Sequence, residues 1–268
     1  MWKNALLSAA LVVFMVGLAP GNGYADDEKV KRFALVIGNQ NYIVSPLKNS
    51  ANDARSISKA LLKIGFDVTT AYDLSSQGFA QSITAFYDHI KTEGNRKSLA
   101  FFYYAGHAVQ VNHRNYLVPV EMDFTQDENW ADKLFDINQL FASFPKHIAM
   151  QNVVVLDACR NNPFKGMDDG LYADGLAPLR APANTLIAYA TEPGSVASDG
   201  KGKNGVYTKY FLKSLKNKVT IEEMFKKVRK GVSKETRKKQ IPWEHSSLLE
   251  DVFLNPPKNR KMPALVTF

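Results

Sequence analysis

The chain has 268 residues, of which 45% are hydrophobic and 22% are charged, and its formal net charge is +8 at pH 7. The hydrophobic share is enough for a sizeable core, and the length suits one large α/β domain better than two small ones. The presence of one cysteine excludes an internal disulfide, so the fold must rest on packing.

The N-terminal segment has the pattern of a secretory signal peptide. Lys3 precedes the uncharged stretch Ala5–Ala19, and the small residues Gly23 and Ala25 stand directly before two aspartates. This order predicts cleavage after Ala25 and export to the periplasm or the extracellular space. A membrane anchor is the alternative, but about fifteen apolar residues are short for a span of roughly twenty. No later stretch is long enough to cross a bilayer, so we expect no membrane span after cleavage.

The pattern of apolar residues predicts alternating strands and helices along the rest of the chain. Strands are expected at residues 33–38, 67–71, 98–104, 153–158, 185–190 and 248–254. Helices are expected at residues 52–64, 77–91, 137–148, 205–215 and 221–232, and a small hairpin at 109–111 and 116–120 with a turn at 112–115. This βα alternation implies an α/β domain whose mainly parallel sheet is covered by helices on both faces. Residues 255–268 are expected to form a tail.

The positive charge is concentrated near the C-terminus. Between Lys213 and Lys239 there are eleven Lys or Arg residues against three glutamates. Ile221, Phe225 and Val228 recur among them at helical spacing, which predicts a helix with one face toward the core and a basic solvated face. A nucleic acid or an anionic envelope surface is the other reading. No aromatic residues are interleaved as in a single-strand binder, so no nucleic acid partner is expected.

The only cysteine, Cys159, follows a strongly apolar run that ends in Asp157. Such a run predicts a buried strand that reaches the edge of a sheet, which is where α/β enzymes place reactive side chains. The alternative is that Cys159 is a small buried hydrophobic residue. A free thiol in an oxidising compartment is a liability, which makes more sense if the thiol is used.

A base near the thiol is needed for chemistry, because a thiol becomes a good nucleophile only when it is deprotonated. The chain has five histidines, at positions 89, 107, 113, 147 and 245. Only His107 follows a predicted buried strand, since it ends the segment Phe101–His107. Two adjacent parallel strands would bring the strand ends before His107 and Cys159 together.

Two segments carry a family resemblance. The runs Tyr103–His107 and Leu156–Asn161, with the histidine about fifty residues upstream of the cysteine, resemble the caspase fold of cysteine peptidases. The segments 34–42 and 190–200 are also similar to this family, so the resemblance covers residues 32–254. The resemblance implies a caspase-like three-layer αβα sandwich in which Cys159 is the nucleophile and His107 the general base and acid. Asp157 makes the chain most similar to the paracaspase and bacterial orthocaspase group.

The resemblance also implies an oxyanion hole, made by the backbone N–H groups of Cys159 and Ala108. Many relatives have glycine where this chain has Ala108. An alanine can supply the same N–H only if its φ is negative. Gly106 is expected to let the strand turn sharply and expose His107.

Substrate choice is the second implication of the resemblance. Asp53 and Asp157 match acidic residues that line the pocket for the residue before the scissile bond, and Asp199 is a candidate third acid. A Lys or Arg side chain entering between carboxylates relieves their repulsion. The sequence therefore predicts a peptide or protein substrate cut after Arg or Lys. The alternatives are that Asp53 caps a helix and that Asp157 caps its strand end.

No cofactor and no tightly held metal are expected. The acidic residues Asp168, Asp169 and Asp174 lack a recognisable calcium-ligand spacing. Two functions from different classes remain open at this stage. One is an exported cysteine endopeptidase, and the other is a non-catalytic caspase-like binding or signalling module, because the same fold also hosts inactive members.

Overall fold

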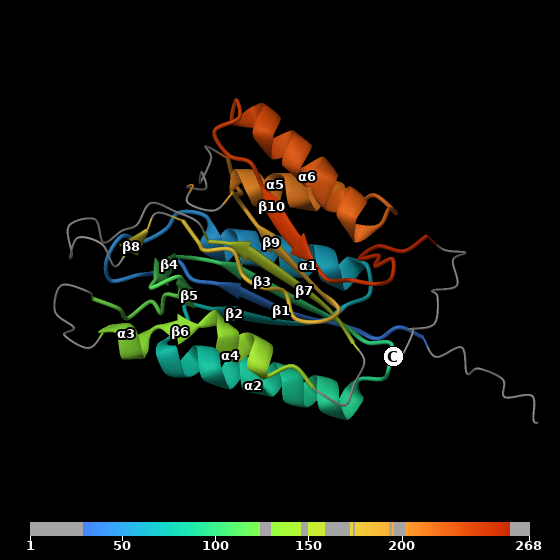
Figure 1. Ribbon diagram of the computed structural model, residues 1–268, viewed down its shortest axis with the longest axis horizontal. Helices are drawn as coiled ribbons and strands as arrows, with labels where there is room; N and C mark the ends of the chain where they lie inside the picture. The colour runs from blue at the N-terminus through green and yellow to red at the C-terminus, as the bar shows by residue number, and fades with distance from the viewer. Residues whose placement is uncertain are drawn as a thin grey trace, which may run out of the picture.

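The computed structural model describes residues 29–123, 130–145, 150–158, 172–173, 175–192, 195 and 202–257. These residues form a six-stranded sheet in the order β10-β9-β7-β3-β1-β2 (Figure 1). Neighbouring strands are parallel except β9 and β10, which confirms the mainly parallel sheet. The strands are β1 (Arg32–Gly38), β2 (Asp67–Tyr72), β3 (Leu99–Ala105), β7 (Gln151–Asp157), β9 (Thr185–Tyr189) and β10 (Trp243–Ser246).

Helices cover both faces of this sheet and complete an αβα sandwich, as expected (Figure 1). One face carries α1 (Ser50–Lys63), α5 (Val206–Ser214) and α6 (Ile221–Glu235). The other carries α2 (Ser76–Glu93) and the short α4 (Ile137–Ala142). None of the helices in the described ranges is both long and apolar enough to cross a bilayer.

Local sequence signals set several helix ends. The Ser75 hydroxyl accepts a hydrogen bond from the N–H of Gly78 at 3.0 Å, which begins α2. The Thr220 hydroxyl accepts a hydrogen bond from the N–H of Glu223 at the start of α6. Helix α1 ends before Gly65, whose φ of 85° is readily adopted only by glycine. These helix boundaries therefore follow from side chains visible in the sequence.

The centre of the sheet is the most deeply buried part of the fold. Every residue of β3 and of β7 is buried, because both faces of these strands are covered by helices. On α6, the residues that face the core are buried while most of the basic ones are exposed, which confirms the amphipathic helix predicted from the sequence. The buried α6 residues are Ile221, Met224, Phe225, Val228 and Val232.

A second, four-stranded sheet has the order β6-β5-β4-β8. It contains β4 (Ala108–Val111), β5 (Arg114–Leu117), β6 (Phe135–Asp136) and β8 (Tyr172–Ala173), and the short helix α3 (Trp130–Lys133) precedes β6. The hairpin of β4 and β5 is confirmed, but its turn has two residues instead of four. Asn112 and His113 have φ values of 48° and 60°, the two left-handed positions of a tight hairpin turn.

Two expectations about elements are wrong. No strand forms at residues 248–254, and the last strand, β10, lies earlier and pairs with β9 as an antiparallel edge. The apolar residues Val252 and Leu254 are buried in the hydrophobic core as irregular chain, so their apolar composition resembles that of a strand although they do not pair with the sheet. The helix expected over residues 137–148 ends at Ala142. Residues 1–25 and 258–268 lie outside the described part of the chain.

Candidate functional site

The site lies where β3 and β7 end side by side. These strands are parallel neighbours, and their register pairs Ala105 with Asp157. His107 follows Ala105 by two residues, and Cys159 follows Asp157 by the same number in the sequence. The prediction that the two strands are adjacent and parallel is therefore confirmed. Cys159 itself lies outside the described residues.

His107 is 4% exposed, and two tyrosines hold its backbone. Its N–H donates to the hydroxyl of Tyr42 at 2.7 Å, and the hydroxyl of Tyr104 donates to its carbonyl at 2.7 Å. The two hydroxyls are 3.0 Å apart. Because Tyr104 gives its proton to the carbonyl, Tyr42 is the donor in that contact. The result is a closed ring of hydrogen bonds that fixes the strand end.

The imidazole ring of His107 is oriented by two further contacts. Its Nε2 lies 2.8 Å from the carbonyl oxygen of Ser45, and its ring packs against that of Tyr42 with centroids 4.4 Å apart. A carbonyl can only accept, so Nε2 carries a proton and Nδ1 is the basic nitrogen of the neutral ring. Ser45 has a φ of 56°, an unusual value for a residue other than glycine. This turn directs its carbonyl at the histidine.

Gly106 is required for a different reason than the sequence suggested. Its φ is not positive, so the strand does not use the conformations reserved for glycine. A Cβ at this position would instead collide with the hydroxyls of Tyr104 and Tyr42. The position therefore needs a glycine because the two tyrosines that hold His107 occupy the space of a side chain.

Ala108 meets the condition set for an N–H donor. Its φ is not positive. The N–H of Val118 donates to the carbonyl of His107 at 3.0 Å, so positions 107 and 118 form a hydrogen-bonded pair of the antiparallel ladder. Since such pairs alternate with non-hydrogen-bonded ones, the next pair, Ala108 and Leu117, directs its N–H groups away from the partner strand.

Asp53 and Asp157 converge on the start of α5. Asp53 is fully buried and Asp157 is 3% exposed. A Cβ on Gly205 would lie 3.0 Å from Oδ2 of Asp53 and 3.9 Å from Oδ2 of Asp157. The fold therefore brings together two acidic side chains that are far apart in the sequence. The third candidate, Asp199, lies outside the described residues.

Asp53 is held by the loop before α5. Its Oδ1 accepts from the side-chain amide of Asn204 at 2.8 Å and from the N–H of Gly205 at 3.0 Å. Asp53 lies in the first turn of α1, where Asn49 is the N-cap residue. The interpretation of Asp53 as the cap of its own helix is therefore wrong, because its carboxylate binds the N-terminal end of α5 instead. The positive end of a helix favours such a negative charge.

Asp157 is held by two hydroxyls. Its Oδ2 accepts from Thr208 at 2.8 Å and from Tyr103 at 3.2 Å, and these two hydroxyl oxygens are 2.6 Å apart. Burial raises the pKa of Tyr103 well above its ordinary value, and the negative charges of Asp157 and Asp53 raise it further. The phenol thus remains a donor, and the carboxylate of Asp157 is fixed beside that of Asp53.

The other histidines have no part in this site where they are described. His89 is an exposed side chain 2.7 Å from Asp67, His113 lies in the hairpin turn, and His245 contacts the carbonyl of Leu179. His147 lies outside the described residues, as do Asp168, Asp169 and Asp174. Within the described part of the chain, no cluster of three or more potential metal ligands occurs.

Sequence reasoning missed the residues that position the site. The Ser45 carbonyl is a backbone atom and has no signature in the sequence. The hydroxyls and the amide act across the fold, so only their burial could have drawn attention to them. These positioning residues are Tyr42, Ser45, Tyr103, Tyr104, Asn204, Gly205 and Thr208.

Replacing Tyr42 by Phe tests the support of His107. The change leaves the buried N–H of His107 without its acceptor, which costs about 1–3 kcal/mol of folding stability. We expect a lower Tm in thermal unfolding and, if His107 is catalytic, a fall in kcat with little change in KM. The control is Tyr72→Phe, since Tyr72 is 40% exposed and its ring contact with Arg55 needs no hydroxyl. Equal Tm values for the two variants would contradict the role of Tyr42.

The comparison with known families agrees with the geometry. Residues 31–253 match the family model described as the caspase domain. A search of curated proteins finds no match. The match spans the whole six-stranded sheet together with His107, Asp53 and Asp157. On this match, and on the αβα sandwich with its mainly parallel sheet, the chain belongs to the caspase domain family of peptidases.

Proposed function

We propose that this protein is an exported cysteine endopeptidase that cleaves peptide bonds after Arg or Lys. The observation that carries the proposal is the convergence of two buried carboxylates, Asp53 and Asp157, beside the strand end that leads to His107. Membership of a peptidase family supports the reaction class. The signal-like segment 1–25 is the basis for proposing export.

In the proposed mechanism Cys159 is the nucleophile and His107 is the base. The Cys159 thiol gives its proton to Nδ1 of His107, and the thiolate attacks the carbonyl carbon of the scissile bond. His107 then returns the proton to the departing amine, which leaves an acyl-enzyme. A water molecule, deprotonated by His107, hydrolyses the thioester and releases the thiolate. The Nε2 contact with Ser45 supports this assignment, because it leaves Nδ1 as the proton acceptor.

The proposed oxyanion hole uses the backbone N–H groups of Ala108 and Cys159. Donors aimed at the developing negative charge are a large catalytic term. The orientation of the Ala108 N–H away from Leu117 and the absence of a positive φ at Ala108 support its role. The alanine at this position is therefore compatible with the donor that glycine supplies in relatives.

The proposed specificity follows from charge. Two carboxylates that face one cavity repel each other, and the cation of an Arg or Lys side chain relieves that repulsion. Arg should be preferred, because its planar guanidinium can bond two carboxylates at once. Thr208, Tyr103 and Asn204 would hold the two carboxylates ready for this contact.

Covalent labelling tests the proposed activity directly. A peptidyl-arginine fluoromethyl ketone should add once to the purified protein, and peptide mapping should place the adduct at Cys159, the only cysteine. The Cys159→Ala variant is the control and should stay unlabelled. Failure of the folded protein to react, or labelling that does not depend on His107, would favour a non-catalytic caspase-like module. N-terminal sequencing of the exported protein should begin at Asp26, and an unprocessed chain would contradict export.

A further inference from the structure

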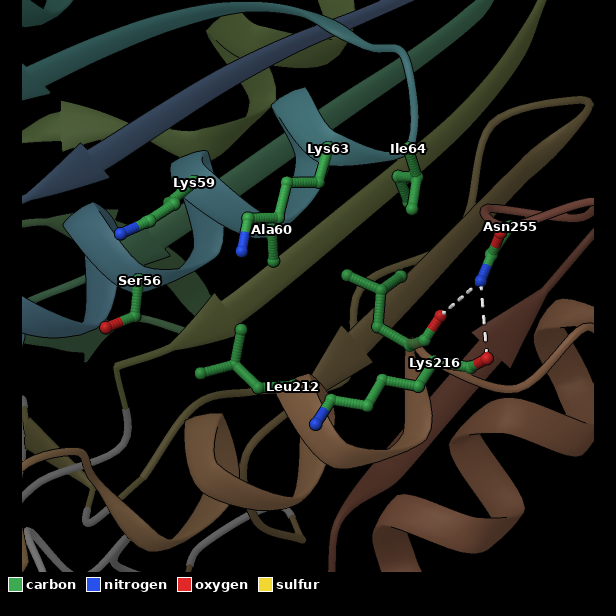
Figure 2. Close-up of a pocket in the computed structure, with 9 residues that line it drawn as sticks. Ser56, Lys59, Ala60, Lys63, Ile64, Leu212, Lys216 and Asn255 are labelled. Atoms are coloured by element: carbon green, nitrogen blue, oxygen red, sulfur yellow. Dashed lines mark hydrogen bonds between the residues drawn. The ribbon is translucent and has the colours of Figure 1, made fainter.

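A groove between α1 and α5 lies outside the candidate active site. It has a volume of about 430 Å³. Figure 2 shows side chains of α1 along one side, Leu212 of α5 and Lys216 just after α5 along the other, and Asn255 at one end. The lining residues are Ser56, Lys59, Ala60, Lys63, Ile64, Leu212, Leu215, Lys216 and Asn255. All nine belong to the described part of the chain.

The floor of this groove is apolar. Ala60, Ile64 and Leu212 pack against the hydrophobic core but remain only partly buried, and Leu215 is buried. The side-chain amide of Asn255 donates to the carbonyls of Leu215 and Lys216, so the end of the groove is tied to the turn that follows α5 (Figure 2). The walls are therefore two helices and an anchored loop, which is a preformed surface.

The rim of the groove is positively charged. Lys59, Lys63 and Lys216 are exposed, and none of the nine lining residues is acidic. None of these three lysines forms an ion pair within the described ranges. Lys59 and Lys63 are also one helical turn apart, where like charges are unfavourable.

Some exposed lysines elsewhere on the fold have a carboxylate partner. Lys91 pairs with Asp88 at 2.8 Å, and Lys227 pairs with Glu223 at 2.9 Å. Among the residues that the structure describes, no carboxylate forms such an ion pair with the three lysines of the groove rim. An apolar floor with an unmatched cationic rim is complementary to a molecule that has an anionic head and an apolar chain.

We infer that the groove binds a single-chain anionic amphiphile, namely an alkyl carboxylate of the fatty-acid type. A volume of about 430 Å³ falls in the range of small-molecule sites. The carboxylate would accept charge-assisted hydrogen bonds from the lysine ammonium groups, and the chain would cover the apolar floor. Both helices contribute contacts, so the ligand binds the folded protein and raises its Tm.

The groove can be tested independently of peptide cleavage. Its Ser56 hydroxyl accepts from the amide of Asn204 at 3.1 Å, and that amide also bonds Asp53. The groove is therefore beside the pocket for the basic residue but does not contain Asp53 or Asp157. A failure of the peptidase assay leaves this inference standing, and a failure of ligand binding leaves the peptidase proposal standing.

Isothermal titration of the full chain with decanoate, below its micelle concentration, is the direct test. We expect one decanoate per chain, no heat with acetate, and no binding of decyltrimethylammonium. Lys63→Glu and Lys216→Glu should each weaken decanoate binding by roughly tenfold or more, because each turns an attractive charge into a repulsive one. The control Lys226→Glu, on the exposed face of α6, should leave the Kd unchanged.

A steric variant completes the test. Ala60→Leu places a larger side chain on the floor and keeps all three lysines, so it should weaken decanoate binding while the far-ultraviolet spectrum stays that of the native fold. Decanoate binding that is insensitive to Lys63→Glu, Lys216→Glu and Ala60→Leu would overturn the site. Equal binding of acetate, or binding to anionic vesicles without binding of monomeric decanoate, would overturn the proposed ligand.

Discussion

Cys159→Ala is expected to reduce hydrolysis of an Arg peptide to background, and His107→Ala is expected to lower kcat/KM by roughly 10²–10⁴-fold. In the proposed mechanism the thiolate forms the acyl-enzyme, and the imidazole accepts and donates the proton at each step. Because the two groups act as a unit, the double variant should be no worse than Cys159→Ala. Initial rates with a fluorogenic Arg peptide measure these effects.

The control for this prediction is His89→Ala. His89 is an exposed imidazole that contacts Asp67 at the start of β2, whereas the site follows the ends of β3 and β7, so its loss should leave the rate unchanged. Circular dichroism should show that all variants are folded. Losses that multiply in the double variant would mean that His107 and Cys159 do not act together, and full activity of Cys159→Ala would exclude the proposed nucleophile.

Substrate charge gives the second large effect. Peptides with Arg before the scissile bond should be cleaved best, those with Lys less well, and those with Asp not at all. In the proposed pocket, an Asp side chain would bring a third negative charge toward the buried carboxylates of Asp53 and Asp157, at a cost of about 2–5 kcal/mol. A peptide library that varies only this position measures the preference. A preference for Asp would contradict the assignment of the pocket.

Replacing each aspartate by asparagine tests whether Asp53 and Asp157 cause the preference for Arg. Asp53→Asn and Asp157→Asn should each raise KM for Arg peptides and lower kcat/KM by roughly ten- to a thousandfold, as expected for loss of a buried charge partner worth about 1.5–4 kcal/mol. The matched control is Asp88→Asn, at an exposed position on α2. Full activity of the double Asn variant on Arg peptides would contradict the assignment of Asp53 and Asp157 to the substrate pocket. It would not contradict the proposed Cys–His pair.

Loss of a hydrogen bond to the Asp157 carboxylate should also raise KM for Arg peptides. Thr208→Val keeps the shape of the side chain but removes a donor to Oδ2 of Asp157, so KM for Arg peptides should rise while kcat changes little. Thr208→Ser restores the hydroxyl and should restore KM. A uniform loss in both variants would indicate a packing role for Thr208 instead of a positioning one.

The sequence by itself determined the location of the buried central strands and of the amphipathic helices. The continuous apolar runs within β3 and β7 predicted buried strands, and the spacing of apolar residues on α6 predicted one buried face. Because parallel strands end at the same edge of a sheet, the positions of His107 and Cys159 after such runs predicted one site. Local patterns of this kind are decided by neighbouring residues along the chain.

Only the tertiary structure decided how that site is held. The carbonyl of Ser45, the hydroxyls of Tyr42 and Thr208 and the N–H of Gly205 reach the site across the fold, and no short-range pattern marks them. The edge strand β10 escaped prediction for a related reason. Its residues are mostly exposed, and its pairing with β9 comes from backbone hydrogen bonds, which depend on which strands meet and not on side-chain polarity.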